Sequence, residues 1–467
     1  MRETILCRIL NLKEIKMNNK RGFASRLGFI LSTAAFSIGI GNLWKFPYVV
    51  GNNGGGAFLL VYLLLVVAIG IPAFLIEIML GRSAQLSPIL GMKKLEGKKT
   101  GWSIIGVLGC FSIFIIVSYA TMIVGGWTGG YIVKILNGSL HGLSAEEIAG
   151  VFGSFAGDPV TLIFAAFEVV LLWLCLNSGI KKGVEKVCSF MLPMLFVIMI
   201  VLAVYSNTLP GAWEGLKWYV IPDFSKVTPD SVAAAATQVF FSIGVGMCGG
   251  FVYGSYISKD TNLTQSVVIT GVLDTLVAVL AGLLIVPALF AFDIEPTAGP
   301  SLIFITLPHL FNQMGSFGTI FGVLFMICVF MAGFTSILGG SEGLVACICD
   351  SGKMSRRGAS TLVCIAQYLF GIIFTLSFGN GAISKIQIGG LGLFDFADFI
   401  SSLGLCLGVL AMLAYVLTRW GFKKFKEEAN QGATGKIRIY DWMKPYVCYI
   451  FPVLLVVVVY WVIRMYY

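Results

Sequence analysis

Ser37-Ile38-Gly39-Ile40-Gly41 is the stretch that decides the fold, and it recurs almost unchanged as Ser242-Ile243-Gly244-Val245-Gly246. The two copies lie inside the first and the sixth long hydrophobic segments. Each glycine costs a helix about 1 kcal/mol relative to alanine, and in lipid the backbone groups that it loosens find no outside partner. Such breaks persist only where the freed groups face protein, water or a ligand. Matching breaks therefore indicate two halves that meet around one site near the membrane midplane.

Composition identifies an all-α integral membrane protein. Of 467 residues, 57% are hydrophobic and 12% charged, whereas soluble domains have about a quarter charged residues. Eleven segments are near or above the roughly 20 residues that a spanning helix needs. They are 27–50, 57–80, 102–136, 160–177, 187–205, 233–258, 267–292, 318–349, 360–378, 394–420 and 446–465. Because five spans separate the repeated phrases, which run in opposite directions, we expect a 5+5 inverted repeat with broken helices 1 and 6.

Basic residues follow the predicted topology. The net charge is +9, and Lys and Arg gather in every second loop, including Lys93, Lys94, Lys181, Lys182 and Arg356. By the positive-inside rule, the N-terminus is cytoplasmic and the C-terminus lies outside a plasma (inner) membrane. The alternation explains the positive charge without nucleic acid.

One transporter domain is expected over residues 20–467, with repeats at about 20–206 and 231–420 and an additional helix at about 446–465. Residues 1–19 are expected to be a disordered cytoplasmic extension. Met17 begins a stretch typical of a natural N-terminus, so residues 1–16 are interpreted as a start-site artefact.

Other function classes lack support in the sequence. We find no phosphate-binding loop, nucleophile motif or His/Cys/Asp constellation, which argues against an enzyme and an ATP-driven pump. A channel would need a continuous polar pore or a repeated filter loop, and neither is present.

Several motifs beside the first break identify a family resemblance. They are Arg26-Leu-Gly, Gly39-x-Gly-Asn42, Lys45-Phe-Pro47 and Asn53-Gly-Gly-Gly-Ala-Phe58. Together they resemble the signature of the neurotransmitter:sodium symporter family, whose bacterial amino acid transporters have the leucine-transporter fold. The resemblance runs from about residue 20 to the end, and eleven spans are similar to a bacterial branch that lacks the twelfth helix.

The resemblance implies a site for the two charged ends of an amino acid. The amides of Ile40 and Gly41 would bind its carboxylate, and the carbonyls of Ser37, Phe241 and Ser242 its amine. This agrees with helix dipoles, since freed amides attract anions and freed carbonyls attract cations. For a single Gly-x-Gly we would favour simple close packing of helices. Two at matching positions favour the site.

Two sodium sites follow from the same resemblance, and both use the oxygen ligands that a hard cation prefers. The first would use Ser37, Asn42, Ser242 and Asp274 with the substrate carboxylate. The second would use Ala35, Ile38, Ala332, Thr335 and Ser336.

Asp274 also bears on chloride. A carboxylate inside a span is expensive and usually functional. Chloride-dependent relatives have an Asn-Ser pattern in this region and recruit an anion to balance the sodium charge. A fixed carboxylate supplies that balance here, so we expect no chloride requirement.

The remaining pocket is expected to suit a bulky hydrophobic or aromatic side chain. Its residues would be Ala34, Phe36, Val117, Gly244, Met247, Ser336 and Gly340, besides Phe241 and Thr121. The family places a carboxylate-binding tyrosine six residues before a tryptophan, and counting back from Trp127 gives Thr121. Either Thr121 donates its shorter hydroxyl, or a local bulge brings in Tyr119.

Support and gating roles are implied as well. Glu77 stands where the family binds the freed amides of the broken helices. Outside, Lys45 would pair with Asp398, with Phe241 as a lid. Inside, Lys20 or Arg21 would pair with Asp350 near Tyr256. Glu168 has no counterpart, and local packing is its default interpretation.

The sequence therefore predicts a sodium-coupled symporter that imports a hydrophobic or aromatic amino acid by alternating access. The alternative is a proton-coupled or sodium-independent permease of the same fold. Expected partners are the amino acid and the bilayer. The oligomeric state stays open, and a monomer suffices for transport.

Overall fold

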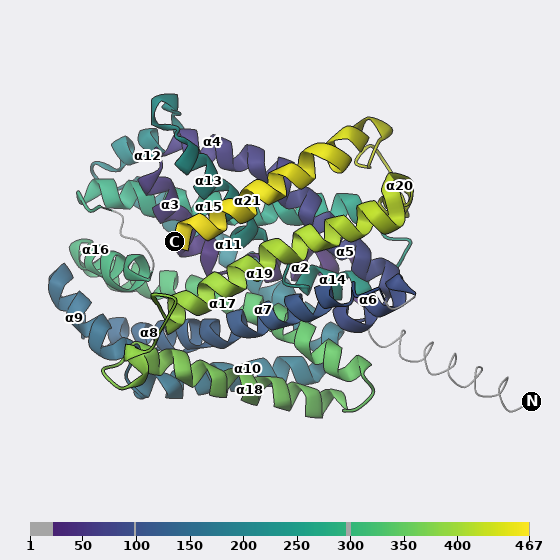
Figure 1. Cartoon of the computed structure of the whole chain (residues 1–467). Helices are drawn as coiled ribbons and strands as arrows, with labels where there is room; N and C mark the ends of the chain where they lie inside the picture. Colours follow the sequence, from purple (N-terminus) through teal and green to yellow (C-terminus); the bar gives the residue numbers. More distant parts are fainter. Residues whose placement is uncertain (1–21, 98–99, 296–299, 467) are drawn as a thin grey trace, which may run out of the picture.

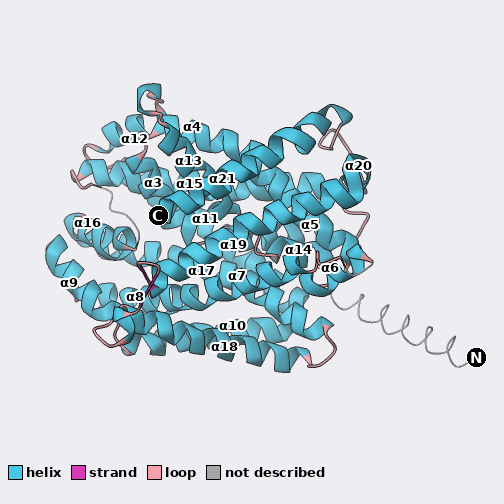
Figure 2. Ribbon diagram, viewed as in Figure 1, coloured by secondary structure: helices cyan, strands magenta, loops and turns pink. Residues whose placement is uncertain are grey.

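The computed structural model describes residues 22–97, 100–295 and 300–466. The described chain is almost entirely helical (Figure 2), apart from a small antiparallel hairpin of β1 (Gln387–Ile388) and β2 (Leu391–Gly392). The predicted all-α membrane fold is confirmed. Lys20 and the predicted N-terminal extension lie outside the described residues.

Helices follow one another along almost the whole described chain. The first half contains α2 (Arg26–Ser37), α3 (Phe46–Asn52), α4 (Gly56–Leu65), α5 (Ile71–Ala84), α6 (Pro88–Glu96), α7 (Ile104–Thr121), α8 (Gly129–Leu136), α9 (Ala145–Ala156), α10 (Val160–Gly179) and α11 (Glu185–Asn207). Then come α12 (Ala212–Val220), α13 (Pro229–Ile243), α14 (Gly249–Ser255), α15 (Leu263–Ala291), α16 (Leu307–Gln313), α17 (Ser316–Asp350), α18 (Arg356–Ser377), α19 (Leu393–Tyr415), α20 (Gly421–Asn430) and α21 (Phe451–Tyr466).

Short π-helical segments join several of these helices. They are η1 (Gly41–Lys45), η2 (Val66–Gly70), η3 (Met122–Thr128), η4 (Ile180–Val184), η6 (Leu302–Thr306), η8 (Val416–Trp420) and η10 (Tyr446–Ile450). Single 3-10 turns occur at η5 (Phe224–Lys226), η7 (Ile383–Lys385) and η9 (Asp441–Met443).

The spans agree with the eleven predicted segments. Among the described residues, eight helical stretches are long and apolar enough to cross a membrane, and the bent pair α2 with η1–α3 makes a ninth. One of the eight, Val160–Asn207, contains both α10 and α11, which meet at Gly179 with a φ of 86°. The broken pair α13 and α14 supplies the last predicted span.

The broken helices lie in the interior (Figure 1). Helix α2 packs on α15 and α17, while α14 packs on α5. Helices α10 and α18 lie side by side along one edge of the molecule, and α19 runs beside α21. The breaks in α2 and α13 are thus shielded from the surrounding lipid, as backbone groups without helical partners require.

Candidate functional site

Both repeated phrases interrupt their helices. After Ser37, Ile38 turns to φ −69° and ψ 104°, and the chain re-forms a helix bent by 58° from the first. After Ile243, Gly244 adopts φ 68° and Gly246 adopts φ 87°. A Cβ on Gly246 would lie 2.1 Å from the carbonyl oxygen of Leu405, so only glycine fits there. The predicted breaks are confirmed.

Glu77 lies at the second break. Its Oε2 accepts a hydrogen bond from the Gly246 amide at 2.6 Å, and its Oε1 accepts one from the Phe251 amide at 3.4 Å. The side chain is fully buried on α5. A carboxylate here satisfies backbone donors that the interrupted helix no longer pairs.

Asn42, Ser242 and Asp274 form a buried polar cluster between the breaks, and none is exposed. Ser242 donates to Asp274 Oδ2 at 2.6 Å, and Asn42 Nδ2 donates to Asp274 Oδ1 at 3.0 Å and to Ser242 Oγ at 2.9 Å. Asn42 Oδ1 accepts from the Gly39 amide at 3.2 Å, and Tyr62 donates to Ser242 at 3.0 Å. Ser242 and Asp274 thus bring oxygen atoms to one point, where Asn42 places its amide group, and oxygen ligands suit a hard cation.

A second cluster joins α2 to α17. The hydroxyl of Ser336 lies 3.3 Å from where a Cβ on Gly39 would stand, so it faces the first break. Thr335 donates to the carbonyls of Met331 and Ala332 at 3.0 and 3.2 Å. Ala35 and Ile38 are fully buried on the facing element. The five residues expected at the second sodium site therefore lie on two elements that pack together.

A cavity of about 360 Å³ opens beside both clusters. Of the expected substrate residues, nine line it: Phe36, Ser37, Ile40, Gly41, Val117, Phe241, Gly244, Met247 and Ser336. Trp44, Lys45, Tyr48, Asp395 and Asp398 extend the lining along the cavity. The cavity therefore combines the backbone of both breaks with an apolar lining.

Four expected pocket residues do not line the cavity. Ala34 and Thr121 are fully buried outside the lining, and a Cβ on Gly340 would meet Ile113 and Val117 at 2.7 and 2.9 Å. Gly340 thus accommodates the side chains of α7 instead of enlarging the pocket. Ser242 is not part of the lining either, because it is fully buried in the cluster with Asp274.

Tyr119, not Thr121, faces the cavity. The Thr121 hydroxyl donates to the Val117 carbonyl at 2.8 Å and accepts from Gln367 at 3.3 Å. The π-helix η3 begins directly after Thr121 and contains Trp127. Its wider turn changes the angular offset between Trp127 and the residues before it. This is the bulge that favours Tyr119.

Lys45 and Asp398 lie at the same part of the cavity lining. The Lys45 ammonium stands 3.9 Å from the centre of the Phe241 ring, and Asp398 Oδ1 accepts from the Tyr119 hydroxyl at 3.2 Å. Lys45, Phe241 and Asp398, expected as one gate, thus all line the cavity.

On the opposite side of the breaks, aromatic rings fill the space. Phe23 packs edge-on against Tyr253 with ring centres 5.6 Å apart, and Tyr253 against Phe36 at 5.8 Å. The Tyr256 hydroxyl donates to Glu342 Oε1 at 2.9 Å, and Glu342 pairs with Arg356. Asp350 accepts from the Ser87 amide at 2.7 Å. Tyr256 therefore contacts Glu342, which sequence reasoning missed, and Lys20 and Arg21, the expected partners of Asp350, lie outside the described residues.

Sequence reasoning missed three polar residues. Tyr62 bonds to Ser242, Glu342 pairs with Arg356, and Gln238 donates to the Gly41 carbonyl at 3.1 Å. Glu342 could have been found, because it is a carboxylate in an apolar span. Tyr62 and Gln238 carry no such signal.

Comparisons with known proteins agree with this geometry. A model described as the sodium:neurotransmitter symporter family matches residues 20–147 and 147–467. YhdH of Bacillus subtilis, named as an uncharacterized sodium-dependent transporter, is 36% identical over 90% of this chain and 93% of its own length. MJ1319 of Methanocaldococcus jannaschii, named likewise, is 30% identical over 94% and 90%. The crystal structure of MhsT in complex with L-phenylalanine matches with a TM-score of 0.84 and 35% identity, covering 95% of this chain and 99% of that one.

Proposed function

The chain belongs to the sodium:neurotransmitter symporter family, and on that premise we propose that it imports a hydrophobic or aromatic L-amino acid with sodium by alternating access. The observation that supports this most is the position of the Asn42–Ser242–Asp274 cluster directly between two broken helices whose backbone lines a cavity.

The broken helices provide helix termini that could bind both the carboxylate and the ammonium group of an amino acid. The amides of Ile40 and Gly41 begin a new helix, where the dipole favours a carboxylate. The Phe241 carbonyl lies 3.7 Å from where a Cβ on Gly41 would stand, close to the site of the carboxylate. In our proposal the Ser37, Phe241 and Ser242 carbonyls bind the amine.

The apolar part of the cavity favours a large side chain. A Cβ on Gly244 would have Met247 and Phe36 as its nearest neighbours, both at 3.7 Å. Gly244 therefore leaves space in the cavity beside one flexible and one aromatic side chain. The structural neighbour MhsT is described with L-phenylalanine. We therefore propose phenylalanine and leucine as the first candidates.

Sodium enters this proposal as a cargo ion at two sites. At the first, Asn42 must turn its Oδ1 towards Ser242 and Asp274, because its Nδ2 now occupies that position. The substrate carboxylate would complete the ligand set, so neither partner binds well alone. At the second, Ser336 and Thr335 would join the Ala35, Ile38 and Ala332 carbonyls and tie α17 to α2.

Asp274 is the basis for proposing chloride-independent transport. Its carboxylate already supplies a negative charge beside the first sodium position, and Tyr62 and Ser242 bond into the same network. An additional anion would be repelled by that carboxylate.

We propose that the protein lies in the plasma membrane. In the proposed orientation the end of the molecule that carries α6 and α20 faces the cytoplasm. That end carries Lys93, Lys94, Lys423, Lys424 and Lys426, which fits the positive-inside rule. The cavity mouth at Lys45 and Asp398 then faces outward.

Uptake into proteoliposomes tests the function. Labelled phenylalanine, leucine and glycine are offered with inward gradients of sodium or choline. We expect uptake of phenylalanine and leucine in sodium alone. Uptake in choline driven by an inward proton gradient would instead establish the proton-coupled alternative.

A further inference from the structure

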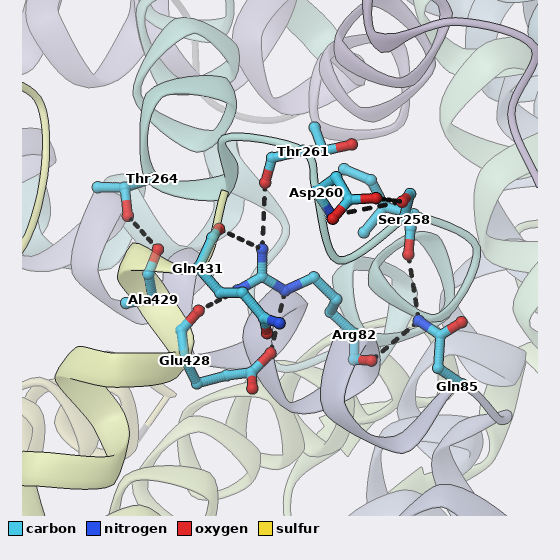
Figure 3. Close-up of polar contacts among 10 residues, drawn as sticks. Arg82, Gln85, Ser258, Asp260, Thr261, Thr264, Glu428, Ala429 and Gln431 are labelled. Carbon is cyan, nitrogen blue, oxygen red and sulfur yellow. Dashed lines mark hydrogen bonds and ion pairs between the residues drawn. The ribbon is translucent and has the colours of Figure 1, made fainter. Parts of the chain in front are cut away.

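Arg82 is a fully buried arginine at the end of α5, beyond the residues of the transport site. Its Nε donates to Glu428 Oε1 on α20 at 3.0 Å, and Nη2 donates to the Glu428 carbonyl. Its Nη1 donates at 3.2 Å to the carbonyls of both Thr261 and Gln431. Figure 3 shows the guanidinium enclosed by these groups from two separate parts of the chain.

Further bonds hold the same parts together. The Thr264 hydroxyl donates to the Ala429 carbonyl at 2.8 Å, and Gln85 Nε2 donates to the Ile257 carbonyl at 3.1 Å (Figure 3). Asn262 Nδ2 donates to the Thr434 carbonyl at 3.3 Å. We call Arg82, Thr261, Glu428 and Gln431 the α20 latch. It joins α5, the loop after α14, and α20.

The latch is mechanically connected to the second helix break. Helix α5 carries Glu77, which binds the Gly246 and Phe251 amides. A Cβ on Gly81, one residue before Arg82, would lie 1.8 Å from the Phe251 carbonyl. Helices α5 and α14 are therefore in direct backbone contact.

Helix α20 belongs to the other side of the contact. It follows α19 and η8 at Gly421, whose φ of 70° permits a sharp change of direction. Helix α19 also carries Asp398, which lines the cavity. The latch thus links the broken helix 6 to a helix that borders the cavity.

A buried guanidinium is costly unless its donors are paired, so the latch is an all-or-none contact. Separating α5 and α14 from α20 would take from Arg82 its bonds to Glu428 and Gln431 and leave it the Thr261 carbonyl, so water must then reach the guanidinium. Such a contact stabilises the closed arrangement strongly and loses its effect once it is opened.

We propose that the α20 latch holds the cytoplasmic end closed while the cavity is open outside, and that it must release before substrate can leave inward. This rests on the proposed function and orientation. It assigns to Arg82 and Glu428 a conformational role separate from the residues that bind substrate and sodium.

Hydrogen exchange of the full-length protein in nanodiscs tests the latch. Glu428→Gln removes the charge and keeps the side-chain shape. We expect the amides of α14 and of residues 256–262 to exchange about fivefold or more faster than in the parent, because hydrogen bonds of a charged group are the stronger ones. Lys426→Gln is the matched control. It breaks the exposed Lys426–Asp441 pair on the same helix, and exchange should stay within about twofold of the parent.

Equal exchange in Glu428→Gln and Lys426→Gln would overturn the proposal. Should Glu428→Gln not fold, Arg82→Lys takes its place, since it keeps the positive charge and removes the forked donors that bond Glu428, Thr261 and Gln431, and unchanged exchange in that variant is equally decisive against the latch. Exchange is measured without substrate or sodium. If the unsubstituted protein fails to take up amino acids, the proposed function is refuted, but the exchange rates still test the latch.

Discussion

At the scale of single residues, we propose that Asp274 determines which ions the site accepts. We expect Asp274→Asn to weaken sodium binding by at least about 100-fold, because a unit charge about 4 Å away contributes about 4 kcal/mol at an effective dielectric constant of 20. The sodium dependence of phenylalanine binding measures this. We also expect the variant to gain stimulation by chloride. Glu168→Gln is the control, since it removes another fully buried carboxylate, on α10. Equal sodium affinity in both variants would contradict the role of Asp274.

Tyr119 and Thr121 make a second pair for comparison. Tyr119→Phe removes the hydroxyl that faces the cavity and bonds Asp398, and we expect about tenfold or more weaker substrate binding, the loss of a hydrogen bond to a charged group. Thr121→Val removes a hydroxyl whose partners are Val117 and Gln367, so affinity should stay within about twofold. Competition binding with labelled phenylalanine distinguishes them. A larger loss in the Thr121 variant would reverse our assignment.

At the scale of elements, Glu77 holds the interrupted helix together. Glu77→Gln replaces one accepting oxygen with a donor that faces the Gly246 or Phe251 amide. We expect this to cost about 1–3 kcal/mol, the penalty for a buried group left unsatisfied. The midpoint of thermal unfolding in detergent should fall clearly. Glu147→Gln, at the exposed start of α9, should leave it nearly unchanged. An unchanged midpoint for the Glu77 variant would show that the break is stabilised otherwise.

Elements also show where sequence reasoning succeeds. The breaks at Gly39 and Gly244 are predictable because glycine acts locally, and Asp274 is predictable because a carboxylate is rare in an apolar span. Counting back from Trp127 leads to Thr121 only if the helix is regular, whereas η3 is π-helical. The family resemblance places Gly340 in the pocket, but Ile113 and Val117 from α7 fill its space. The position of Thr121 thus depends on a local change of helix type and that of Gly340 on contacts between helices, and composition and spacing contain neither.

At the scale of the whole molecule, the two sodium sites that we propose would allow steep accumulation of the substrate. One charge crossing 100 mV gains about 2.3 kcal/mol, roughly a fiftyfold gradient, and a second ion multiplies it. We therefore expect two sodium ions to move with each amino acid. In proteoliposomes clamped at zero potential, a tenfold sodium gradient should then be balanced by an opposing substrate gradient of about 100-fold, because RT ln 10 is about 1.4 kcal/mol for each ion.

The direction of net flux of labelled phenylalanine reports the balance point. A reversal at about tenfold would mean that one ion moves with each substrate. In that case Asp274→Asn and Thr335→Ala decide between the two proposed sites. The substitution at the site that is coupled to transport should abolish the dependence of the reversal on sodium, and the other substitution should not. Replacing chloride by gluconate should leave the reversal unchanged, since in our proposal the negative charge that balances sodium belongs to Asp274 and does not dissociate from the protein.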